Sequence, residues 1–114
     1  MNILEETNSI IQKLNIPVET GVFTSKAPDC YVVLVPLNDS FPLSADDLPT
    51  NDMQELRITL FTKNNYISVK NNIVKNILSA GLTITERRYN GFDTGAGYHQ
   101  YTIDIAGIYE IEEE

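Results

Sequence analysis

Residues 53–82 read MQELRITLFTKNNYISVKNNIVKNILSAGL, and the spacing of their apolar residues changes once along the stretch. Leu56, Ile58 and Leu60 alternate with other residues, which is the period of two of a strand that buries one face. After Asn65 the apolar spacing becomes helical, with a stripe made of Tyr66, Val69, Ile73, Ile77 and Leu78. Because the connecting turn is short, the strand and the helix can pack their apolar faces together, and we expect this pair to form the nucleus of the core.

Both ends of this helix carry recognisable signals. Asn65 can cap the N-terminus by accepting a hydrogen bond from a free backbone N–H. Gly81 supplies the left-handed conformation that commonly ends a helix, and Leu82 can then fold back onto the last turn. The helix is therefore predicted to end just before Gly81.

Three elements are expected upstream. Residues 2–14 predict a helix capped by Asn2, with one apolar stripe and with Glu5 as a reciprocal capping partner. Residues 18–23 predict a short strand. The run YVVLVPL, residues 31–37, predicts a central strand covered on both faces. Its proline, Pro36, is expected near the strand end or at a sheet edge, since it donates no hydrogen bond.

Two strands are expected downstream, at residues 82–89 and 98–109. In the second, Tyr101, Ile103 and Ile105 should face one way and Thr102 and Asp104 the other. Gly107 is predicted to form a bulge where this alternation shifts. The Asn90–Gly91 pair is a turn signal, so residues 90–97 are predicted to be a loop.

The predicted order is helix, strand, strand, strand, helix, strand, strand. Strands that follow each other without an intervening helix favour an antiparallel sheet, so the predicted class is α+β with two helices packed on one side. Residues 1–109 are expected to form a single domain, and residues 110–114 a disordered acidic tail. The predicted core consists of Leu56, Ile58, Leu60, Ile73, Ile77, Val33 and Ile103.

Charge is distributed unevenly along the 114 residues. Residues 57–88 contain six basic residues and one acidic residue, a local balance of +5, so the remainder carries −13 of a net charge of −8. A net charge of this sign disfavours nonspecific binding to a nucleic-acid backbone. It favours a protein whose basic face meets an acidic face of a neighbour, although an ordinary solvated surface also accounts for the pattern.

Residues 38–51, NDSFPLSADDLPTN, form a long acidic segment between two predicted strands. Loops of this length are often functional or mobile, so we expect this loop to become ordered only in an assembly. Phe41 offers an apolar contact there, and Asp46 and Asp47 offer charge.

No motif predicts catalysis, a metal site or a cofactor. Cys30 is the only cysteine and is expected to be a small buried residue at a strand start. His99 with Asp93 and Asp104 has metal-ligand chemistry, but alternation places His99 and Asp104 on opposite faces of a regular strand. No segment has the ~20 apolar residues of a membrane helix, and the N-terminus lacks the basic residues of a signal peptide.

Several motifs together resemble a known family. These are the strand QELRITLFTK, the Asn-rich turn, the LSAG helix end, the sequence Arg87-Arg88-Tyr89, the loop at Asp93-Thr94, and Tyr98-His99 leading into Thr102-Ile103-Asp104. In this order they resemble the tail terminator, or tail completion, proteins of long-tailed phages and prophages of Gram-positive bacteria. The closest matches are Arg57, Gly81, Asp93, His99 and Asp104, and none of these motifs is a catalytic signature.

The resemblance implies a non-enzymatic virion component. Such a protein forms a hexameric ring that caps the tail tube and contacts the tail tube protein and the head completion protein. DNA passes through the ring without sequence-specific binding, and assembly takes place in the bacterial cytoplasm. We expect the following residues to lie at an oligomer or partner interface: Arg57, Phe61, Arg87, Arg88, Phe41, Asp46 and Asp47.

Two other classes of function fit the sequence. A small acidic inhibitor or immunity-type protein would be a stable monomer that binds a basic enzyme. A ligand-binding or catalytic domain would need a concave pocket around Tyr98, His99 and Asp93 with convergent polar groups.

Overall fold

The computed structural model describes residues 2–22, 26–41 and 51–111. Two helices and five strands follow each other in the predicted order, so the α+β class is confirmed. Their bounds are α1 (Ile3–Lys13), β1 (Val18–Thr20), β2 (Cys30–Ser40), β3 (Asn51–Thr62), α2 (Tyr66–Ser79), β4 (Thr83–Asp93) and β5 (Tyr98–Glu110).

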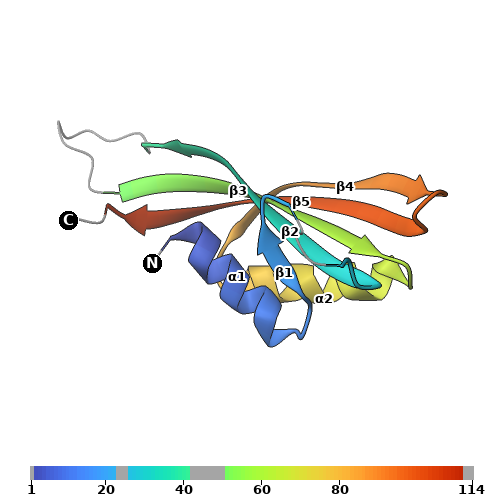
Figure 1. Ribbon diagram of the computed structural model, residues 1–114. Coiled ribbons are helices and arrows are strands. Elements are labelled where there is room, and N and C mark those ends of the chain that lie inside the picture. Colours follow the sequence, from blue (N-terminus) through green and yellow to red (C-terminus); the bar gives the residue numbers. More distant parts are fainter. Residues whose placement is uncertain (1, 23–25, 42–50, 112–114) are drawn as a thin grey trace.

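The strands form one sheet in the order β1-β2-β3-β5-β4. Only β1 and β2 are parallel, and the other three pairs are antiparallel. Both helices lie on the same side of the sheet, below it in Figure 1, as the sequence predicted. The molecule is elongated, with extents of 52 × 26 × 23 Å, because β3 and β5 are longer than the helix layer that covers them.

Helix ends follow the predicted chemistry. The Asn2 side chain accepts a hydrogen bond from the Glu5 backbone N–H at 2.8 Å, and Asn65 accepts one from Ile67 at 3.1 Å. Gly81 has φ +83°, and the Leu82 N–H bonds back to the carbonyl oxygen of Ile77. These contacts satisfy backbone groups that a helix end otherwise leaves unpaired.

The core lies between the helices and the covered face of the sheet. Its fully buried side chains are Ile11, Val32, Leu34, Leu56, Ile58, Leu60, Ile73, Ile77, Ile103 and Ile105. The placement of Val33 in this core was wrong, because Val33 pairs with Thr59 on the opposite, helix-free face. The sequence pattern also assigned Leu78 to the buried stripe of the helix, which was wrong. Leu78 is 56% exposed, since it lies 100° around the helix from Ile77.

The predicted bulge at Gly107 was wrong. The pairing of β3 with β5 is continuous through Gly107. The two bulges in the pairing of β4 with β5 lie on β4, between Ile84 and Glu86 and between Tyr89 and Gly91. Gly107 is closely packed, because a Cβ atom there would lie 2.8 Å from side-chain atoms of both Leu82 and Tyr109, which would have to shift.

The Asn90–Gly91 turn was also wrong, since β4 continues through these residues to Asp93. The hairpin turns at residues 94–97, where the Asp93 side chain accepts a hydrogen bond from the Gly95 N–H at 3.0 Å. The bulge at Asn90 resembles a turn in sequence because both structures favour Asn and Gly.

Strand β2 is longer than predicted. Residues 38–40 belong to it, so the predicted loop begins later, and residues 42–50 lie outside the described part of the chain. Pro36 lies beyond the end of the pairing with β1 and next to a register shift. It therefore occupies an edge, as a residue without an N–H should.

Candidate functional site

At one end of the sheet β2, β3 and β5 extend beyond β1 and β4. We call this extension the arm, and it comprises residues 37–41, 51–55 and 107–111. The arm contains only three strands, with β3 between β2 and β5. The pairing of β2 with β1 ends at Leu34, and the pairing of β5 with β4 ends at Ala106. Figure 1 shows these three strand ends projecting past α1 on the left. Both edges of the arm are thus unpaired in the described chain, and unpaired strand edges favour association with another chain.

The arm exposes apolar and acidic side chains together. Its exposed large apolar residues are Leu37, Phe41, Ile108 and Ile111, and Phe41 is 64% exposed. Its described residues include four acidic residues and no basic residue: Asp39, Asp52, Glu55 and Glu110. A surface of this composition suits a partner that is both apolar and basic.

Contacts with α1 hold the arm in place. The Tyr109 hydroxyl donates a hydrogen bond to the Glu6 carboxylate, and the Ile3 N–H donates one to the Gln54 side chain at 2.8 Å. Burial, together with the neighbouring carboxylate of Glu6, raises the pKa of the Tyr109 hydroxyl well above its ordinary value. The hydroxyl therefore stays protonated and keeps donating to Glu6 at any physiological pH.

A surface hollow of about 420 Å³ lies where the arm meets the start of β4. Met53 and Ile108 line it together with Glu55 and Thr83. Ile108 is 55% exposed. The volume falls in the range of about 300–1,000 Å³ that is usual for sites taking a small molecule or a large side chain.

An aromatic cluster, here called the tip, occupies the opposite end of the sheet. It consists of Tyr66, Tyr89, Phe92, His99 and Tyr101. The Tyr66 and Tyr89 rings stack with centroids 4.7 Å apart, and the Phe92 and His99 rings lie 4.8 Å apart. His99 Nδ1 also forms a hydrogen bond with the Tyr89 hydroxyl at 3.0 Å.

The second bulge of β4 creates the tip. In a regular strand Tyr89 and Phe92 would point to opposite faces, because they are three residues apart. The extra residue between Tyr89 and Gly91 restores the alternation, so that Tyr89 pairs with Tyr101 and Phe92 pairs with His99 on one face.

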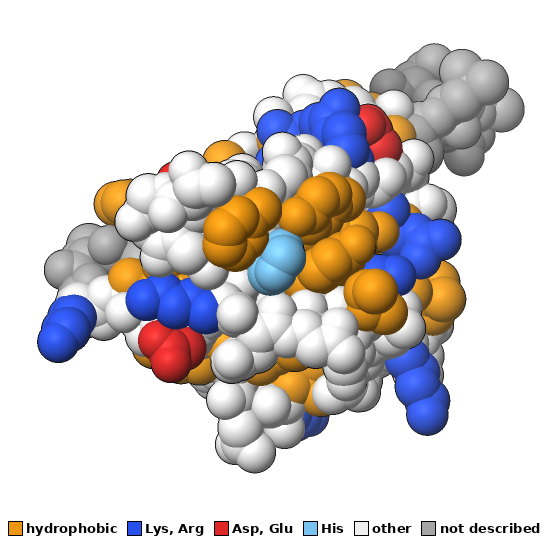
Figure 2. All heavy atoms as spheres, turned by 90° about the vertical axis from the view of Figure 1, so that its right-hand side faces the viewer, with side chains coloured by type: hydrophobic (Ala, Val, Ile, Leu, Met, Phe, Trp, Pro, Cys, Tyr) orange, Lys and Arg blue, Asp and Glu red, His pale blue; other side chains and the backbone are white. Residues whose placement is uncertain are grey.

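Basic residues surround the tip. Figure 2 looks at this end of the molecule and shows His99 between apolar side chains, with blue Lys and Arg groups around them and little red. The Lys70 ammonium lies 5.5 Å from the Tyr101 ring centre, and Arg87 lies two residues before Tyr89 on β4, on the same face of the sheet. Phe92 is 49% exposed. The tip is therefore apolar and basic, whereas the arm is apolar and acidic.

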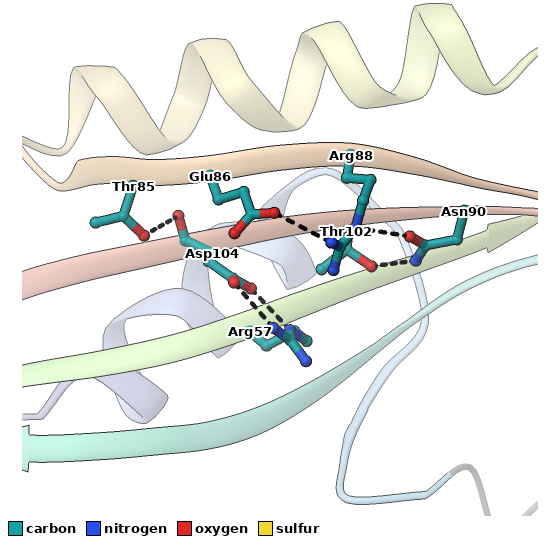
Figure 3. A network of polar contacts seen from close by, with 7 residues as sticks. All are labelled: Arg57, Thr85, Glu86, Arg88, Asn90, Thr102 and Asp104. Carbon is teal, nitrogen blue, oxygen red and sulfur yellow. Dashed lines mark hydrogen bonds and ion pairs between the residues drawn. The ribbon is translucent and has the colours of Figure 1, made fainter.

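A polar network ties the strands together between the two ends, on the helix-free face (Figure 3). The Arg57 guanidinium donates two hydrogen bonds to the Asp104 carboxylate, at 2.9 and 3.0 Å. Arg88 pairs with Glu86 at 3.3 Å and with Asn90 at 3.2 Å, and Asn90 bonds to Thr102. Hydrogen bonding to Asp104 raises the pKa of Arg57 further, so its charge is permanent.

The predicted interface residues do not form one surface. Phe41 lies at the arm. Arg87 lies on β4 on the face of the tip, whereas Arg88 lies on the helix-free face and pairs with Glu86. Arg57 is partly used inside the molecule by its contact with Asp104. Phe61 lies on the helix-free face, where its ring stacks on Tyr31 with centroids 4.8 Å apart. The remaining two, Asp46 and Asp47, lie outside the described residues.

The residues considered for chemistry are separated by the sheet. His99 belongs to the tip on the helix side, whereas Asp104 binds Arg57 on the other face, as alternation predicted. Tyr98 also points away from His99, since its ring contacts Phe61 and its hydroxyl donates to the carbonyl oxygen of Pro28. Within residues 2–22, 26–41 and 51–111, no group of three or more His, Cys, Asp or Glu could hold a metal ion.

Cys30 begins β2 and is partly buried against the core. Burial raises the pKa of its thiol, and a hydrogen bond with Thr62 opposes this effect only in part. Burial thus disfavours the thiolate form of Cys30.

Sequence analysis missed most of the tip and the hollow. Tyr89, Phe92 and His99 meet only because of the bulge between Tyr89 and Gly91, and the Asn90–Gly91 pair had been interpreted as a turn. Ile108 was predicted only as part of a strand. It is exposed at a position of β5 that β4 does not reach, because the pairing of β4 with β5 ends at Ala106. Only the composition could have indicated the tip, since four of its five residues are Tyr or Phe in a chain that is 9% aromatic.

Comparison with known protein families finds no family model that matches the chain, and no curated protein matches its sequence. None of the helices in the described part of the chain is both long enough and apolar enough to span a membrane.

Proposed function

We propose that this protein is a structural virion component, a tail terminator or tail completion protein that forms a ring at the head-proximal end of a phage tail tube. The observation that carries the proposal is the separation of an acidic, apolar arm from a basic, apolar tip along a molecule 52 Å long. A subunit with two different and complementary ends favours head-to-tail contacts, which close into a ring when the rotation between copies allows it.

The polar network of the helix-free face fits a structural role. Arg57 and Asp104 pair with each other there and link β3 to β5. The sequence resemblance to tail terminators indicates which assembly the protein would form, a ring that also contacts the tail tube protein and the head completion protein.

A net charge of −8 suits the passage of DNA through such a ring. An acidic lumen repels the phosphate backbone, so DNA slides through it without being held. In this proposal the protein is part of the virion and assembles in the cytoplasm of the bacterial host.

An acidic inhibitor of a basic enzyme is the weaker candidate. It needs only one acidic surface, which the arm provides. It gives no role to the exposed tip, where Tyr89 and Phe92 stand among basic side chains.

Deleting the gene from the phage or prophage that carries it tests the proposed function. Electron microscopy of the particles should show overlong tails or heads without tails, because the tail tube has lost its terminator. Expression of the wild-type protein from a plasmid should restore normal particles. Tailed particles of normal length after deletion would contradict the proposal.

A further inference from the structure

The hollow beside the arm and the exposed rings of the tip fit one another in chemistry. The hollow is lined by the apolar residues Met53 and Ile108 and by the acidic residue Glu55. The tip presents Phe92, which is 49% exposed, and the Lys70 ammonium lies 5.5 Å from the centre of the Tyr101 ring in the same cluster. An apolar ring with a neighbouring cation is the kind of group that an apolar hollow with one carboxylate accommodates best.

A single chain cannot make this contact with itself. His99 in the tip and Ile108 at the hollow both lie on β5, nine residues apart along an extended strand, which is about 30 Å. The sheet between them is fixed by continuous pairing of β3 with β5. The occupant of the hollow must therefore come from another molecule.

Charge complementarity identifies that molecule as a second copy of the chain. The described residues of the arm carry four acidic groups and no basic group. Lys70 lies over the Tyr101 ring of the tip, and Arg87 lies on β4 on the same face of the sheet. Because every copy has both surfaces, each one can accept a tip at its hollow and offer its own tip to the next copy.

We propose that the tip of one copy, led by the Phe92 ring, docks into the hollow beside the arm of the next copy, with Glu55 facing the basic residues around the tip. This inference rests on the proposed function for its place in a ring, and it names the two surfaces that meet there. Exposed charges orient the two copies, and the buried ring and the apolar lining of the hollow hold them together.

Photo-crosslinking tests this contact on the isolated protein. The photoreactive residue p-benzoylphenylalanine replaces Phe92 and keeps an aromatic ring at that position. Concentrated ¹⁵N-labelled and unlabelled proteins are mixed at low salt and irradiated, and the crosslinked peptides are identified by mass spectrometry. We expect crosslinks between differently labelled chains, from position 92 to residues 53–56 or 106–111.

The matched control places the same photoreactive residue at Val22, which is 66% exposed and belongs to neither surface. Crosslinks to the arm should be at least several-fold fewer from position 22. The substitution Ile108→Asp, in a protein whose circular dichroism is unchanged, should lower the yield from position 92 to the control level. Equal yields from positions 22 and 92, or crosslinks from position 92 that avoid the arm, would overturn the inference.

This experiment separates the inference from the proposed function. Crosslinks to the arm together with normal tails after gene deletion would leave the contact standing and remove the phage function. Overlong tails after deletion without these crosslinks would leave the function standing and remove the contact.

Discussion

Two residues show how side-chain chemistry fixes the sheet between the arm and the tip. The Asp104 side chain is only 11% exposed, and the Arg57 guanidinium satisfies both of its oxygens. A carboxylate this deeply placed needs such a partner, because an unpaired charge away from water is costly. The ion pair links β3 to β5, the two strands that run the length of the molecule.

Replacing Arg57 with Met should lower the free energy of unfolding by about 1–3 kcal/mol, because Asp104 loses its charged partner. Urea denaturation followed by circular dichroism measures the change. Arg88→Met is the matched control, since the Arg88 pair with Glu86 is more than half exposed on both sides and should contribute about 0–1 kcal/mol. Equal effects of the two substitutions would show that burial does not determine the strength of these pairs.

Gly107 is the second residue that constrains the fold, here by its lack of a side chain. Gly107→Ala should destabilise the protein by about 1–3 kcal/mol, because the new methyl group overlaps Leu82 and Tyr109. Gly95→Ala is the control, since a Cβ atom there would meet only Asp93 Oδ1 at 3.4 Å. Thermal unfolding compares the two variants, and a Gly107→Ala protein as stable as the control would show that the neighbours move aside without cost.

At the scale of elements, helix α2 decides how the core is closed. It buries Ile73 and Ile77 completely against the sheet and turns Leu78 towards solvent. Its cap at Asn65 and its end at Gly81 were both predicted from the sequence, because capping depends on local residues alone.

Ile77→Ala should cost about 2–5 kcal/mol of unfolding free energy, because truncation leaves a cavity in a packed core. Leu78→Ala, at the next position, should change it by about 0.5 kcal/mol or less. Chemical denaturation of both variants, with the same signal and buffer, measures the difference. Similar losses at the two positions would contradict the helix orientation described here.

The sequence predicts what local patterns determine and fails where pairing between distant segments decides. Alternation in residues 56–60 and 101–105 correctly placed the core faces of β3 and β5. The position of Val33 was wrong, because a continuous apolar run has no alternation from which to choose a face. The tip was missed because the Asn90–Gly91 pair is compatible with a turn and with a bulge, and the pairing with β5 distinguishes the two.

At the scale of the whole molecule, the two ends differ in charge and share an apolar character. Attraction between exposed charges is screened within about 8 Å at physiological salt, so charge alone orients copies without holding them. Apolar contacts such as Phe92 at the tip and Ile108 at the arm must supply most of the affinity. We therefore expect copies to associate weakly in dilute solution and to form a closed ring on the end of a tail.

Compensating charge reversal in assembling phage tests the central claim, that the arm of one copy meets the tip of the next. One variant carries Lys70→Glu with Arg87→Glu, a second carries Glu55→Lys with Glu110→Lys, and a third carries all four substitutions. Each is expressed in a deletion host after its fold has been verified, and tail lengths are measured by electron microscopy. The account predicts overlong or missing tails with each double variant and normal tails with the quadruple variant, because the opposite charges face each other again. A quadruple variant that assembles no better than the two double variants would contradict it.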